Sequence, residues 1–291
     1  MTQPSLSPPR HSSEEEATAS SVESRSLTLP SWLTPKAVLP PVLFASALIG
    51  FWYVLVELLS DRKKLLLPRP HTMFGETVLT SEIRSELWSG LLVTGKVALV
   101  GLFISMVLGI IGAVVMNSAP WAERAFFPWA VVIQTLPTLA LVPLIAIWFG
   151  FGFSSRLIVV VMISMFPILT NTLFGLQSAD ADLHSLFTLQ GASRTTRLFK
   201  LEFPAALPAM FTGFRIAAGL SVIGAIVAEF FFGRGAKGLG NLVSKYRGLA
   251  QMSELYASVL LSSLFGVVVF WAFTYLTKRM VGAWHESLEN E

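Results

Sequence analysis

The chain carries one polar segment between long apolar runs, and its residue types suit a surface that another protein could bind. The segment runs from Asp180 to Gly219 and is rich in arginine, lysine and serine. Gly191, Pro204 and Pro208 are residue types that end or bend helices, so they predict reversals of chain direction. A water-facing segment of this kind, placed between membrane spans, is expected to be a contact point for a partner.

Ionisable side chains inside the apolar runs are the other groups that could do chemistry. Lys96 and Arg215 lie near predicted span ends, from which long basic side chains reach the membrane interface. Glu229 is flanked by apolar residues near the end of its run, where a carboxylate is costly unless it is paired or hydrated. A gating role and a structural ion pair would each account for it.

Polar and helix-breaking residues also occur within the predicted spans. Proline frees a backbone carbonyl and kinks a helix, which is tolerated where side chains or cavity water satisfy the backbone. Gln134 and Asn171 are polar at membrane depth, and they could line a pathway or form ordinary interhelical hydrogen bonds. The candidate residues of a translocation path are Gln134, Pro137, Pro143, Asn171, Thr172 and Glu229.

No motif in the chain predicts catalysis or a metal site. Residues 90–97, GLLVTGKV, nearly match a phosphate-binding loop, but Val97 has no hydroxyl group for magnesium and no strand precedes the motif. The chain has no cysteine, and its 4 histidines lie far apart. The chain is therefore not expected to be an enzyme, and ATP hydrolysis that drives it would take place on another chain.

The composition is typical of a helical membrane protein. Hydrophobic residues make up 53% of the chain, charged residues only 13%, and the mean hydropathy is +0.65. A soluble domain carries about 25% charged residues, and the apolar runs here are long enough to cross a bilayer. The net charge of +3 is scattered and forms no basic stripe of the kind that binds nucleic acid.

Three regions are predicted. Residues 1–36 are rich in proline, serine, glutamate and threonine and are expected to form a disordered cytoplasmic tail. Residues 37–280 form the transmembrane domain, and residues 281–291 form a short cytoplasmic tail. The spans number about six and are predicted at 37–60, 90–117, 126–150, 156–176, 208–232 and 255–280, with a short interfacial helix at about 80–90.

An even number of crossings would place both termini on the same side of the membrane. The positive-inside rule does not decide which side that is, because lysine and arginine are divided almost equally between the two sets of loops. The orientation has to come from another argument.

The central polar segment resembles the coupling segment of bacterial type I ABC-importer permeases, which has the pattern EAA-x3-G-x9-I-x-L-P. Gly191 fits the glycine, and Leu201, Phe203 and Pro204 fit the Ile, Leu and Pro positions. Residues 185–187, Ser-Leu-Phe, stand where the family has its acidic-Ala-Ala triad. The coupling segment is predicted at about 178–208.

The blocks that flank this segment strengthen the resemblance. Residues 136–152, 166–175, 191–219 and 227–240 are similar, in this order, to blocks of the nitrate/sulfonate/taurine permease family. The similarity covers roughly residues 65–280. It implies an all-α polytopic membrane protein with about six transmembrane helices in the type I ABC-importer (MetI-like) permease fold.

The resemblance also implies partners for the chain. Two copies of the permease would surround a central path in a bacterial cell membrane, with both termini in the cytoplasm. Two cytoplasmic ATPase subunits would bind ATP and magnesium and grip a short helix within about 181–200, and an extracytoplasmic solute-binding protein would dock near 150–155 and 233–253. The implied ATPase-coupling residues are Ser185, Gly191, Ala192, Ser193, Arg194, Leu201, Phe203 and Pro204.

Three other functions are alternatives to an importer permease. An ion-coupled secondary transporter would need inverted repeats and intramembrane charge sites, and the sequence shows neither matching halves nor many charges. An intramembrane enzyme would need a nucleophile and base or metal ligands within the spans. A structural scaffold would not require the ordered blocks around the coupling segment. The solute stays open among sulfonates, nitrate, taurine and vitamin precursors.

Overall fold

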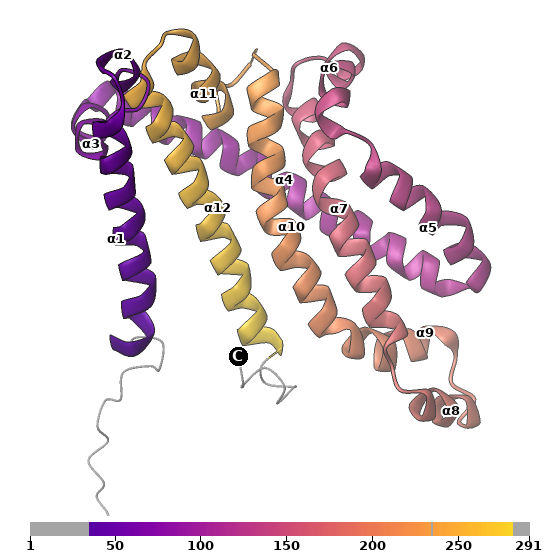
Figure 1. Ribbon diagram of the computed structural model, residues 1–291. Coiled ribbons are helices and arrows are strands. Elements are labelled where there is room, and N and C mark those ends of the chain that lie inside the picture. The colour runs from indigo at the N-terminus through magenta and orange to yellow at the C-terminus, as the bar shows by residue number, and fades with distance from the viewer. Residues whose placement is uncertain (1–34, 234, 282–291) are drawn as a thin grey trace, which may run out of the picture. The chain divides into compact units, whose positions relative to one another are not determined.

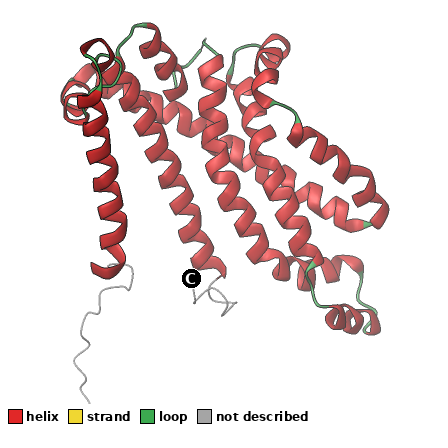
Figure 2. Ribbon diagram, viewed as in Figure 1, coloured by secondary structure: helices red, strands yellow, loops and turns green. Residues whose placement is uncertain are grey.

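The computed structural model describes residues 35–233 and 235–281 (Figure 1), so the predicted tails at 1–36 and 281–291 lie almost wholly outside the described residues. All regular structure in the described part of the chain is helical (Figure 2). The chain divides into two units, one up to Leu55 and one from Val56 onward. Helix α1 (Pro35–Leu58) is apolar along its length and long enough to cross a membrane, as predicted for the first span.

Helix α4 (Ser81–Ser118) is a single helix of 38 residues. It follows two short helices, α2 (Asp61–Lys64) and α3 (Pro70–Val78). The segment at 80–90, predicted as a short interfacial helix that leads into the second span, is helical and continues into that span without a break. No proline interrupts it, and its serine and glutamate residues allow the helix to extend beyond the apolar run.

The predicted third span at 126–150 is not one straight helix. It consists of α5 (Pro120–Thr135) and α6 (Thr138–Phe149), which meet at an angle of 95°. Proline lacks the N–H that would continue the helix, and it pushes the preceding residue into an extended conformation. Leu136, directly before Pro137, accordingly has φ −63° and ψ 133°.

The number of crossings depends on this bent pair. The described residues contain 5 helices that are long and apolar enough to cross a membrane, or 6 if α5 and α6 together form one crossing. The prediction of about six spans is therefore confirmed in this form.

Helices α7 (Phe153–Gln177) and α10 (Phe203–Phe231) form the centre of the second unit, and α4 crosses behind both of them in Figure 1. Glycines allow these helices to pack closely. A Cβ atom on Gly175 would lie 2.9 Å from the Cα of Ala206, and one on Gly224 would lie 3.1 Å from the Cα of Val160. The packing partners show that α7 and α10 run in opposite directions side by side.

The second unit has two distinct ends. Helices α8 (Ala181–Leu189) and α9 (Arg194–Arg197) lie at one end, here called the α8 end, where α12 (Met252–Val281) also finishes (Figure 1). Helix α11 (Leu239–Gly248) and α6 lie at the opposite end, called the α11 end. The central polar segment and the 233–253 segment therefore emerge on opposite sides of the helical layer.

Candidate functional site

Helix α8 is a short helix with defined ends and no buried residue. The side chain of Asp180 caps its start by accepting hydrogen bonds from the backbone N–H groups of Asp182 and Leu183. Gly191 ends it with φ +65°, a left-handed conformation that favours glycine. The predicted reversal at Gly191 is thus present, and the next N–H, that of Ala192, bonds back to the carbonyl of Phe187 at 2.9 Å.

The surface of α8 is partly apolar. Leu183, Leu186 and Leu189 are exposed, Leu189 to 87%. Ser185 is also exposed, and its hydroxyl group donates to the carbonyl of Ala181 within the helix. Exposed leucines on a polar segment at one end of a bundle are typical of a surface that a partner covers.

Two arginines hold α9 to its surroundings. Ser193 caps α9 by accepting from the N–H of Thr196, and Arg194 Nη2 donates to the carbonyl of Asn117 at the end of α4 over 2.9 Å. Arg197 Nη1 donates to the hydroxyl group of Thr188 in α8. These contacts fix the position of the polar segment relative to α4.

Residues after α9 do not turn the chain back, contrary to the prediction for Pro204 and Pro208. A π-helical turn (Leu198–Glu202) leads into α10, and the helical stretch is continuous from Arg194 to Phe231. Pro204 lies in the first turn of α10, directly after the wide turn, where the missing N–H is tolerated. Leu201 is buried. Phe203 is partly buried and packs against a core cluster that contains Leu173 of α7 and Met210 of α10.

The six candidate path residues do not form one cluster. Gln134 and Pro137 are exposed at the bend between α5 and α6, and Pro143 is exposed on α6. Asn171 is half-buried, donates to the carbonyl of Pro167 in its own helix and packs against Gly213. Thr172 is buried within α7.

Glu229 is fully buried, so in this conformation it does not line an open path. Its Oε2 accepts from the hydroxyl group of Thr94 at 2.7 Å and from the N–H of Gly240 at 3.1 Å. Its Oε1 lies 3.8 Å from Arg156 Nη1, which itself donates to the carbonyl of Ala236. The carboxylate thus joins α10 with α4, α7 and the first turn of α11, as a structural role predicts.

The start of α11 is shaped around this carboxylate. A Cβ atom on Gly238 would overlap the Glu229 carboxylate, and one on Gly240 would overlap the carbonyl of Ile226. The side chain of Asn241 donates to the carbonyls of Glu229 and Phe232. We name this group, Thr94, Arg156, Glu229, Gly238 and Gly240, the Glu229 cluster.

A second contact holds α11 to the start of α4. Lys245 Nζ lies 2.6 and 2.7 Å from the two carboxylate oxygens of Glu86, and the phenol of Tyr246 donates to the same carboxylate at 2.8 Å. Burial raises the pKa of Tyr246, and the hydrogen bond to Glu86 raises it further. The phenol therefore stays protonated and remains a donor across the physiological pH range.

Sequence reasoning missed most partners in these contacts. Asn117 joins the end of α4 to the polar segment through Arg194 and also through Glu202, whose carboxylate accepts from its side-chain amide at 2.7 Å. Thr94 lies within residues 90–97, the near match to a phosphate-binding loop, and nothing in that motif predicts its hydroxyl group as a partner of Glu229. The sequence offered one signal of this contact: Gly238 and Gly240 follow Glu229 by nine and eleven residues, and glycines permit a close approach to its carboxylate.

Comparison with known proteins identifies the family of this architecture. Residues 105–282 match the family model described as "Binding-protein-dependent transport system inner membrane component". The chain is 33% identical over 232 residues to the formylaminopyrimidine transport permease protein ThiX of Halalkalibacterium halodurans, covering 80% of this chain and 90% of the relative. It is 32% identical to the riboflavin transport system permease protein RibX of Chloroflexus aurantiacus, covering 82% and 88%.

The fold also matches a solved structure. A chain of the MetNI methionine ABC transporter, determined in inward-facing conformations, superposes with a TM-score of 0.59 at 15% identity. The match covers 69% of this chain and 98% of that chain. At this identity the similarity shows the fold alone, and it agrees with the MetI-like fold that the sequence blocks implied.

Proposed function

The chain belongs to the family of binding-protein-dependent transport system inner membrane components, the permeases of ABC importers, and on that premise we propose that it couples to a separate ATPase through residues 180–208. Helix α8 carries the proposal. It is a defined helix without buried residues, it exposes three leucines, and Arg194 and Arg197 hold the segment that follows it. A partner that covers α8 would thereby push or pull on α4 and α10.

The continuity of the helix after Arg194 supports the coupling role. The stretch from Arg194 to Phe231 runs without a break from the α8 end to the Glu229 cluster at the α11 end. A displacement at the ATPase contact would therefore reach the opposite side of the membrane through one rigid element. Alternating access around a site at mid-depth requires such a connection.

The proposal extends to the assembly and its orientation. The α8 end faces the cytoplasm, where two ATPase subunits bind ATP and magnesium, and the α11 end faces an extracytoplasmic solute-binding protein. A second copy of this chain completes the path in a bacterial cell membrane. This chain itself binds neither ATP nor a metal ion.

The solute is proposed to be a small organic molecule or anion. Relatives named for a formylaminopyrimidine and for riboflavin support a vitamin-precursor class, and the sequence blocks shared with sulfonate, nitrate and taurine permeases support small anions. Uptake competition between neutral heteroaromatic compounds and alkylsulfonates, in cells that express the whole system, separates the two classes.

Co-purification tests the coupling. The tagged chain is extracted from native membranes in mild detergent, and an ATPase with an intact phosphate-binding loop is expected to co-purify. Leu189→Asp, in α8, is expected to abolish this association, whereas Leu249→Asp, at an exposed leucine of the α11 end, should leave it intact. A chain that purifies alone and transports in liposomes under an ion gradient without ATP would instead establish a secondary transporter.

A further inference from the structure

Arg215 is a charged residue of α10 that no contact described above uses. It is half-buried, and its guanidinium carbon lies 5.8 Å from the ring centroid of Phe270 on α12. Within the described residues, none of the ion pairs involves it. A guanidinium group offers five N–H donors in a planar fork, so a position without an acidic partner calls for an explanation.

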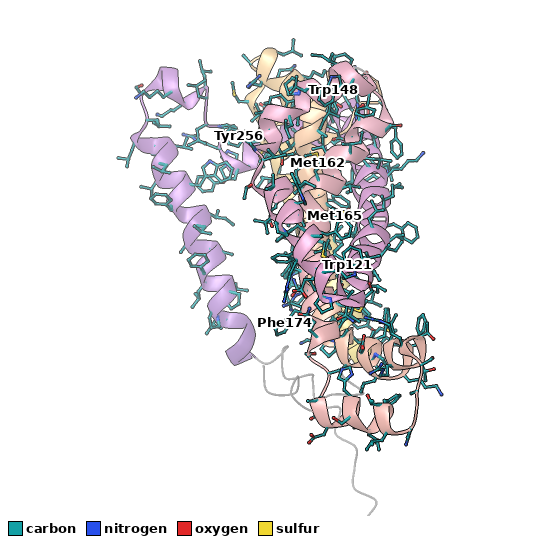
Figure 3. All side chains as sticks on the ribbon, turned by 90° about the vertical axis from the view of Figure 1, so that its right-hand side faces the viewer. Trp121, Trp148, Met162, Met165, Phe174 and Tyr256 are labelled. Carbon is teal, nitrogen blue, oxygen red and sulfur yellow. The ribbon has the colours of Figure 1, made fainter. Side chains whose placement is uncertain are left out.

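Arg215 lies at mid-depth in the helical layer. A Cβ atom on Gly213, two residues away, would lie 2.9 Å from the carbonyl oxygen of Pro167, near the middle of the 25-residue helix α7. At 1.5 Å per residue, Arg215 is about 18 Å from the start of α10 and about 24 Å from its end. In Figure 3, Met165 of the same part of α7 lies between the two ends of the layer.

This depth corrects the prediction that Arg215 lies near a span end. The predicted fifth span began at residue 208, but α10 begins at Phe203 and continues a helix from Arg194. Because Gly213 packs against Pro167 near the middle of α7, Arg215 lies near the centre of the layer rather than at the end of a span. Lys96 differs, since its ammonium lies 5.5 Å from the ring centroid of Phe153, the first residue of α7.

A groove between α10 and α12 begins one turn from Arg215. It has a volume of about 510 Å³ and a mostly apolar lining of valine and isoleucine side chains, together with Gly219, Ser262, Ser263, Gly266, Phe270 and Trp271. Residues 215 and 219 are one helical turn apart and so share a face of α10. Phe270 belongs to the groove and contacts Arg215, which therefore lies at the end of the groove nearer the α8 end.

Lipid, tightly packed protein and water are the three environments that this face could meet. An arginine at mid-depth in hydrocarbon is costly, and such residues face a bundle interior or a water-filled cavity. Glu229, the one carboxylate of the described part of α10, is about 21 Å away along the helix and already bonded to Thr94 and Gly240.

We propose that the groove between α10 and α12 faces the water-filled translocation path, and that Arg215 binds oxygen acceptors of the solute at mid-depth. This inference rests on the proposed permease function. It places the path along a different face from the candidates at the α5–α6 bend.

The side chains define the chemical class of the solute. A guanidinium fork pairs with two acceptors in one plane, as in a carboxylate, a sulfonate, or adjacent oxygen and nitrogen atoms of a heteroaromatic ring. Phe270 and Trp271 add aromatic surface for an apolar body. The solute is therefore a small organic molecule with a multi-acceptor edge, and uptake competition distinguishes an anionic edge from a neutral one.

The absence of cysteine from the chain makes a direct test possible. Gly219→Cys places a thiol in the groove, where an added Cβ meets no atom within 4 Å. Phe103→Cys is the control, since Phe103 is 67% exposed on α4. It is matched in depth, because Gly101 and Gly224 pack against the same residue, Val160.

Two water-soluble methanethiosulfonate reagents, one anionic (sulfonatoethyl) and one cationic (trimethylammonioethyl), are the probes. At Gly219→Cys both reagents are expected to react. The ratio of the anionic to the cationic reaction rate should be several-fold higher than the same ratio for a free thiol in solution. Arg215→Gln should remove this preference, and Arg215→Lys should retain it. Phe103→Cys should react with neither reagent.

A comparison that leaves Arg215 unchanged covers the case in which its variants do not insert. Val259→Cys lies at the far end of the groove, eleven residues along α12 from Phe270. Its preference for the anionic reagent should be weaker than that of Gly219→Cys, because the potential of a charge falls with distance. Equal preferences at both positions would overturn the role of Arg215.

An unreactive Gly219→Cys, or one that reacts no faster than Phe103→Cys, would show that lipid or protein covers the groove and would overturn the proposal. The labelling does not depend on the ATPase. If the groove is reactive but no ATPase co-purifies with the chain, the coupling function alone is refuted. If an ATPase co-purifies but the groove is unreactive, this inference alone is refuted.

Discussion

The hydroxyl group of Thr94 donates a hydrogen bond of 2.7 Å to the carboxylate of Glu229, across 135 positions of the chain. The same hydroxyl oxygen accepts from the backbone N–H of Leu239 at 2.8 Å. One threonine thus connects α4, α10 and the first residue of α11. Because Glu229 also accepts from Gly240, the start of α11 has a defined position relative to the spans.

Removal of the Glu229 carboxylate is expected to destabilise the protein. Glu229→Ala leaves the buried donors of Thr94 and Gly240 and the charge of Arg156 without their partner, at a cost of about 3–5 kcal/mol. Glu229→Gln keeps an oxygen acceptor for both donors and should cost clearly less. The midpoint of thermal unfolding in detergent measures both, and equal midpoints for the two variants would contradict the assigned hydrogen bonds.

A side chain at Gly238 is expected to disrupt the same cluster. Its Cβ would overlap the carboxylate of Glu229, whereas a Cβ on Gly248, the last residue of α11, would meet no atom within 4 Å. Gly238→Ala should lower the unfolding midpoint, and Gly248→Ala should leave it unchanged or raise it slightly. Identical effects of the two substitutions would show that the close approach at Gly238 does not exist in solution.

Loss of the Arg194 contact is expected to impair coupling more than stability. Arg194→Ala removes the hydrogen bond to the carbonyl of Asn117 at the end of α4, an exposed contact worth about 1 kcal/mol or less. The ATPase should still co-purify, but solute uptake should fall. Lys200→Ala, which removes a positive charge from the same segment, is the control. If Arg194→Ala and Lys200→Ala reduced uptake equally, the positive charge of the segment, rather than the hydrogen bond from Arg194 to Asn117, would account for the loss.

Labelling of single cysteines in intact cells checks the orientation. A cysteine at Leu189, at the α8 end, should be protected from a membrane-impermeant maleimide until the cells are opened. A cysteine at Leu249, at the α11 end, should react in intact cells. Both leucines are exposed, at 87% and 59%, so a difference in labelling reports the side of the membrane. The reverse pattern would invert the proposed topology.

Much of the fold could be predicted from the sequence alone. Apolar runs must be helical in lipid, since each backbone N–H and C=O has to be satisfied within the segment. Gly191 likewise predicted a reversal of chain direction, because glycine adopts the left-handed conformation more readily than other residues. The short helix within about 181–200 was implied by the family resemblance. The family resemblance was confirmed, and it rested on blocks that lie in the same order in this chain.

Helix boundaries and bends were harder to predict. Pro137 lies at the 95° bend between α5 and α6. Pro204 and Pro208 lie near the start of α10, after a π-helical turn, and do not interrupt the helix. The same residue type has opposite outcomes, and the difference lies in the hydrogen bonds and packing around it.

The sequence by itself determined the membrane class, the approximate spans and the position of the polar segment, because these follow from local composition and from backbone hydrogen bonding. Only the tertiary structure decided which residues meet. Thr94, Glu229 and Gly240 come together because α4, α10 and α11 pack closely at one end. Arg215 lies at mid-depth because α10 packs through Gly213 against the middle of α7. Contacts between distant segments depend on packing geometry, which no local pattern encodes.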